Sequence, residues 1–80
     1  MKKNITINLF GTLYNIDEDA YQLLDNYLQS MKRYFGSKDG GEEIAEDIEH
    51  RVAELLWEKK DQGIDAISIE IIKEIIGKIG

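Results

Sequence analysis

Residues 4–17, NITINLFGTLYNID, decide the fold. Apolar residues in this stretch alternate with polar ones, which is the pattern of strands that have one buried face. With Phe10-Gly11 as a two-residue loop, one side of a hairpin collects the cross-strand pairs Leu9 with Thr12, Ile7 with Tyr14, and Ile5 with Ile16. Gly11 supplies the positive φ that a tight turn requires, and Leu13 is an apolar exception on the opposite face. The stretch therefore predicts a β-hairpin over about residues 4–16.

Two long amphipathic helices are predicted after the hairpin. The first, over about residues 18–35, has Asp17 as its expected N-cap and stops at Gly36. Its apolar stripe is Tyr21, Leu24, Leu28, Met31 and Phe35. The second, over about residues 42–61, begins with glutamates and ends with lysines, which complements the helix dipole, and Gly63 is its expected stop. Its stripe is Ile44 or Ala45, then Ile48, Val52, Leu55 and Leu56.

The C-terminal segment carries two patterns. Residues 66–71 alternate like a strand, whereas Ile72, Ile75, Ile76 and Ile79 repeat at helical spacing. We favour a short helix over about residues 69–79 with Ser68 as its N-cap, and a third strand over residues 66–71 is the alternative. A two-stranded hairpin alone is marginal in water, so its apolar face must lie on the helices. Residues 1–80 are therefore expected to form one α+β domain, a hairpin packed on two long helices and one short C-terminal helix.

Composition bounds the classes of function. The 80 residues include 16 acidic and 10 basic side chains and have a net charge of −6, and no basic run exceeds two residues. Nucleic-acid binding draws most of its affinity from Lys and Arg on phosphates, so direct nucleic-acid binding is disfavoured. The chain has no cysteine, which excludes disulfides and favours a reducing cytoplasmic setting. No apolar stretch reaches the length of a signal peptide core or a membrane span.

The titratable residues form no recognisable catalytic or metal-binding pattern. His50 is the only histidine, and between Glu46 and Glu54 at helical spacing it is expected to be a surface side chain rather than a metal ligand. The carboxylates of residues 42–47 are expected to form a solvated helix start. The serines lie in no nucleophile elbow, and no glycine-rich phosphate loop is present. We therefore expect no enzyme activity, no cofactor and no metal.

Three apolar residues are candidates for an interaction surface. Trp57 adjoins the core stripe at Leu56, where packing is the ordinary role, but tryptophan is also enriched at interface hot spots. Phe10 lies in the hairpin loop, and Leu13 lies on the polar face of the hairpin. The unpaired edge of a hairpin also invites pairing with another chain or another copy. The expected partner is therefore a protein or a second copy of this chain.

The linear pattern of the whole chain carries a resemblance. The matching segments are KNITINL (3–9), Gly11-Thr12, IDEDAY (16–21), LDNYL (24–28), RYF (33–35), GEEI (41–44), DIE (47–49), RVAEL (51–55) and ISIE (67–70). In this order they resemble the N-terminal segment of Bacteroidetes PspC-domain proteins, which are phage-shock-protein-C-like, stress-responsive transcriptional regulators. No segment is a catalytic motif, so the resemblance transfers no residue role.

The resemblance implies a cytoplasmic, non-catalytic regulatory module at the head of an envelope-stress protein, one that engages protein partners. In that family the segment precedes a PspC domain with membrane-spanning helices. We therefore expect this chain, which ends at Gly80, to be an excised or truncated piece, with membrane association only through a C-terminal region absent from it. The family label also raises an alternative, a regulator that contacts DNA directly.

Overall fold

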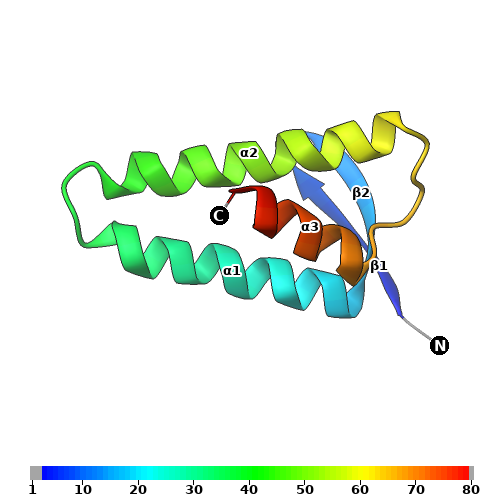
Figure 1. Ribbon diagram of the computed structural model, residues 1–80, viewed down its shortest axis with the longest axis horizontal. Coiled ribbons are helices and arrows are strands. Elements are labelled where there is room, and N and C mark those ends of the chain that lie inside the picture. Colours follow the sequence, from blue (N-terminus) through cyan, green and yellow to red (C-terminus); the bar gives the residue numbers. More distant parts are fainter. Residues whose placement is uncertain (1–2, 80) are drawn as a thin grey trace.

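The computed structural model describes residues 3–79 and has the predicted α+β architecture (Figure 1). A two-stranded antiparallel hairpin is followed by two long helices and a short one. The elements are β1 (Asn4–Leu9), β2 (Thr12–Asp17), α1 (Glu18–Gly36), α2 (Gly41–Asp61) and α3 (Ile69–Ile79). Each expected element is present, and its bounds lie within a residue of the expected ones, because the turn and cap residues that end them are local signals.

The hairpin has the register that the alternation predicts. Ile7 faces Tyr14 and Ile5 faces Ile16 across the strands. In the loop, Gly11 has a φ of 86°, but Phe10 also has a positive φ, of 51°. Two positive φ values in a two-residue loop are the signature of a tight turn whose twist matches the strands. A bulky residue is unusual in this region of backbone space, so the sequence predicted only the glycine.

The hydrophobic core lies at one end of the two long helices. Figure 1 shows α1 and α2 close together at the loop 37–40 and farther apart at their other end, with α3 in front and the hairpin behind. The core residues there are Tyr14, Ile16, Ala20, Leu24, Val52, Leu55, Leu56, Ile67, Ile72 and Ile75. At the loop end, Ala45 is buried and Ile44 is exposed, which decides between the two candidates for the start of the α2 stripe. That end forms a two-helix arm outside the core.

The helix ends use backbone contacts more than the sequence suggested. Asp17 occupies the N-cap position of α1, as expected, but its side chain makes no capping hydrogen bond. Its N–H instead donates to the Ile67 carbonyl at 2.9 Å, which ties the strand end to the C-terminal segment. At the end of α2, Gly63 has a φ of 91°, and Ile64 N–H donates to the Lys59 carbonyl, the bond of a glycine-terminated helix.

The ambiguous segment 66–71 contains both patterns. Ile67 forms a single parallel bridge with Ile16, and its N–H donates to the Asn15 carbonyl at 2.8 Å. The helix then begins at Ile69, and the Ser68 hydroxyl accepts the Ile71 N–H at 3.4 Å, which confirms Ser68 as its cap. The alternation thus marks one strand-like residue, and the helical repeat marks the rest.

Candidate interaction surfaces

The three candidate residues are all exposed, but they do not form one site. The exposed fractions are 54% for Phe10, 56% for Leu13 and 53% for Trp57. Phe10 and Trp57 line one hollow between the hairpin tip and α2. Leu13 lines a different hollow, between β2 and the α2–α3 connection. The candidate surface therefore divides into an aromatic hollow and a β2-side hollow.

The aromatic hollow is built around a contact that sequence analysis missed. The ring of Phe10 stacks on the ring of His50, with 4.0 Å between centroids and 16° between planes. Phe10 and His50 lie forty positions apart, so no local pattern could have joined them. The left-handed backbone at Phe10 aims its side chain at α2 rather than at the hairpin's own core. The stack fixes the tip of the hairpin on α2.

Trp57 reaches this hollow through the periodicity of α2. It lies seven residues after His50, which returns it to the same side of a helix. Its neighbour Leu56 is completely buried, so the turn of the helix carries Trp57 outward. Ala53 lies between the two rings on that side, and its small side chain leaves the hollow open, with a volume of about 330 Å³. The aromatic hollow is thus formed by Phe10, His50, Ala53 and Trp57, with Leu9 and Tyr14 beneath.

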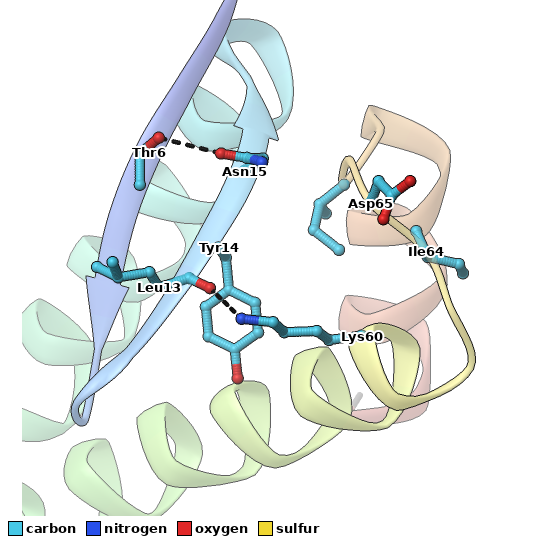
Figure 2. Close-up of a pocket in the computed structure, with 8 residues that line it drawn as sticks. Thr6, Leu13, Tyr14, Asn15, Lys60, Ile64 and Asp65 are labelled. Atoms are coloured by element: carbon cyan, nitrogen blue, oxygen red, sulfur yellow. Dashed lines mark hydrogen bonds between the residues drawn. The ribbon is translucent and has the colours of Figure 1, made fainter.

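The β2-side hollow is lined by both polar and apolar side chains, and Lys60 lies across it (Figure 2). The Nζ atom of Lys60 donates to the Leu13 carbonyl at 2.7 Å and lies 5.5 Å from the centroid of the Tyr14 ring. Thr6 and Asn15 join across the strands, with the Thr6 hydroxyl donating to the Asn15 side-chain oxygen at 3.0 Å. The hollow has a volume of about 450 Å³. The ammonium group of Lys60 is already bound to the Leu13 carbonyl at the sheet edge.

Two titratable groups near these surfaces have pKa values that are shifted by their neighbours in the fold. Burial raises the pKa of Tyr14 above its ordinary value of 10.0, and a hydrogen bond with Thr12 acts in the opposite direction. The hydroxyl of Tyr14 donates to the Ala53 carbonyl at 3.4 Å, within the core. A hydrogen bond from Lys59, reinforced by its charge, lowers the pKa of Glu74. Both shifts belong to contacts between elements of the fold.

Two other features of residues 3–79 bear on the class of site. No three His, Cys, Asp or Glu side chains among them are placed so as to hold a metal ion. Within the same residues, no helix combines the length and apolar character needed to cross a membrane.

Comparison of this chain with protein-family models, with curated proteins and with solved structures found no match. The resemblance to PspC-domain proteins therefore stays a prediction from sequence. The proposal for the function is based on the surfaces described above.

Proposed function

We propose that this chain is a non-catalytic protein-interaction module that binds a protein partner through the aromatic hollow. The observation that carries the proposal is the gathering of two half-exposed aromatic side chains, Phe10 and Trp57, on either side of His50. Aromatic side chains give large contact area at low entropy cost, and interface hot spots are enriched in them. Single exposed apolar side chains are common on protein surfaces, whereas two aromatic rings lining one hollow are typical of an interface.

The strained backbone at Phe10 supports the same function. A bulky residue with positive φ costs about 1 kcal/mol or more, and such strain persists where the surrounding structure holds it. Asparagine or glycine would form this turn at lower cost. The ring of Phe10 is exposed and contacts His50 rather than the core. A surface role for the ring accounts for its presence.

The regulatory setting follows from the resemblance to PspC-domain proteins. On that basis the module acts on the cytoplasmic face of the inner membrane, in an envelope-stress protein whose membrane helices lie in a separate C-terminal region. A partner docked in the aromatic hollow would report or control the state of that region.

The charge distribution weighs against direct DNA binding. Lys3, Arg51 and Lys59 each pair with a glutamate, and Lys60 is bound to the Leu13 carbonyl. Basic side chains paired with carboxylates offer less charge to phosphates. The aromatic hollow itself is bordered by Glu54, and among residues 3–79 its lining has no basic side chain beyond His50.

Site-specific photo-crosslinking in the native cell tests the function. A photoreactive amino acid replaces Trp57 in one variant and Glu43, exposed near the other end of α2, in a control. We expect a discrete protein adduct from position 57 that is absent from position 43 and is reduced by Phe10→Asn, which the turn tolerates. Equal labelling at both positions, or adducts insensitive to Phe10→Asn, would refute the aromatic hollow as the docking surface.

A further inference from the structure

The outer edge of β1 is a second docking feature, distinct from the aromatic hollow. In an antiparallel hairpin, successive residues point their backbone groups alternately toward the partner strand and away from it. Asn15 turns its carbonyl outward, since that carbonyl accepts the Ile67 N–H. Its partner Thr6 therefore turns outward on the other side, and by the same alternation so do Asn4 and Asn8. These residues form a row of backbone donors and acceptors along the edge.

The row on β1 has no protein partner among residues 3–79. The corresponding row on β2 is covered, because Ile67 binds Asn15 and Asp17, and Lys60 binds the Leu13 carbonyl. None of the backbone or side-chain hydrogen bonds outside the ladder engages the backbone of Thr6 or Asn8 in the described part of the chain. An exposed row of this kind is a template for another strand.

A hollow of about 350 Å³ lies directly beside the bare edge. Its apolar lining comes from the inner face of β1 and from one side of α1, namely Ile7, Leu9, Tyr21, Leu24 and Leu28. Because side chains alternate between the faces of a strand, a strand added to β1 would place every second side chain over this lining. Backbone bonds to β1 and an apolar trough on a helix are the two parts of a strand-addition site.

The residues around this hollow indicate the charge that a bound segment should carry. Asp25 and Glu49 border it together with Lys32, and the next hollow toward the loop 37–40 adds Glu42 and Glu46. We call these two adjoining hollows the trough. Four carboxylates and one ammonium border it, so its surroundings are negatively charged. The carboxylates of α2 lie near the Leu9 end of β1, since Leu9 and Glu49 share the hollow. A strand in this trough is favoured if it carries basic residues at that end.

A second copy of the chain does not fit this edge. Two β1 strands paired about a two-fold axis would place both helix layers on the same side of the joined sheet. Neighbouring strands lie only about 4.8 Å apart, whereas packed helices lie about 8–10 Å apart, so the two helix layers would crowd each other beneath the joined strands. Figure 1 shows the loop end of α1 and α2 projecting past the hairpin. The arm would occupy the space that the second copy's helices need.

We infer that the β1 edge binds an extended segment of a partner protein, with apolar side chains at alternate positions and basic residues at the end that faces α2. This inference goes beyond the proposed function, because it adds a second recognition site, with its own peptide chemistry, apart from the aromatic hollow. The segment would add as a third strand over the α1–α2 arm, with its backbone bound to Asn4, Thr6 and Asn8.

Peptide titration with residue-level readout tests the inference. The probe is a peptide of about ten residues that alternates valine and threonine and carries two terminal lysines. One control has the same composition with the valines in a block, and another replaces the lysines with glutamates. We expect the alternating basic peptide to bind about tenfold or more tightly than either control, and to slow hydrogen exchange of the Thr6 and Asn8 amides.

Variants of the chain make the test specific. Thr6→Pro removes an outward N–H and leaves the ladder intact, so we expect it to weaken binding by about tenfold. Leu28→Lys, which keeps a helix former in α1 and puts a charge in the trough, should weaken binding similarly even if Thr6→Pro does not fold. Leu13→Lys, on the opposite side of the hairpin, is the matched control and should bind as the parent chain does.

Three outcomes would overturn the inference. They are equal binding of patterned and blocked peptides, binding insensitive to both Thr6→Pro and Leu28→Lys, and protection of the Thr6 amide by raised protein concentration without peptide. The last would show that a second copy uses the edge. The result of photo-crosslinking at position 57 does not depend on any of these three outcomes. The inference about the β1 edge can therefore be refuted while the proposed function at the aromatic hollow stands.

Discussion

The two edges of the hairpin have similar sequences and opposite surroundings. Both strands alternate apolar and polar residues, yet Tyr14 and Ile16 of β2 are buried, whereas Ile5 and Ile7 of β1 are only half-buried. The difference arises because the chain returns beside β2 through Ile67, whereas no segment of residues 3–79 pairs with the outer edge of β1. Residues distant in sequence close one edge here, so the burial of each strand depends on the segment that packs beside it.

The largest expected effect comes from removing the residue that closes the β2 edge. Ile67 is 2% exposed, and truncation of a buried isoleucine to alanine costs about 2–5 kcal/mol. We expect Ile67→Ala to lower the free energy of unfolding by an amount in that range, as measured by urea denaturation with circular dichroism. Leu13→Ala, on an exposed side chain of β2, should cost no more than about 0.5 kcal/mol. Similar losses for the two would contradict the closed edge.

Proline distinguishes the inward and outward positions of β1. Ile7 directs its N–H to Tyr14, so Ile7→Pro leaves a carbonyl unpaired in the ladder, at a cost of about 1–3 kcal/mol. Thr6→Pro removes only an outward N–H, which edge strands tolerate, and its effect on stability should be clearly smaller. Thermal unfolding of the two variants checks the order, and a reversed order would mean that the edge assignment is wrong.

Sequence reasoning succeeded where the signals are local. The alternation indicates the strand register, Gly11 indicates the turn, and Ser68 indicates the start of α3. Each of these signals depends only on residues a few positions away. It failed where distant residues compete with a local preference. Asp17 does take the N-cap position of α1, but its side chain makes no capping hydrogen bond, and its N–H donates to the Ile67 carbonyl, a contact that no local pattern indicates.

The interaction surfaces were only partly predictable for the same reason. The places of Phe10 in the loop and Leu13 on the polar face indicate exposure, and both are exposed, whereas Trp57, for which packing was the ordinary expectation, is exposed as well. The grouping of Phe10 with His50 depends on the left-handed backbone of the turn, which phenylalanine does not signal. The bare edge of β1 could be anticipated, but which of the two edges stays bare depends on where Ile67 lies.

The hairpin tip joins the two edges, and its attachment to α2 can be measured by a double-mutant cycle. The Phe10–His50 stack is half-exposed, so we expect a coupling free energy of about 0.5 kcal/mol between Phe10→Asn and His50→Ala. Phe10→Asn alone should be nearly neutral, because relief of the positive φ offsets the lost contact. Urea denaturation of the four proteins gives the coupling, and a value of zero would show that the ring position on His50 contributes nothing to stability.

The smallest effect concerns the ion pair that fixes α3, and with it Ile67, against the end of α2. Lys59 Nζ lies 2.8 Å from Glu74 Oε2, and this contact lowers the pKa of Glu74 below its ordinary value of 4.5.

A carboxyl whose pKa is lower in the folded chain stabilises the fold at pH values above the pKa of that carboxyl in the unfolded chain. That contribution is lost as the pH falls through the folded pKa. Glu74→Gln should therefore flatten the acid limb of the stability–pH curve slightly. Because the carboxylate is half-exposed, added salt should shrink the difference between the parent and Glu74→Gln. An acid limb identical in the parent and Glu74→Gln at low salt would mean that α3 is held by its buried isoleucines alone.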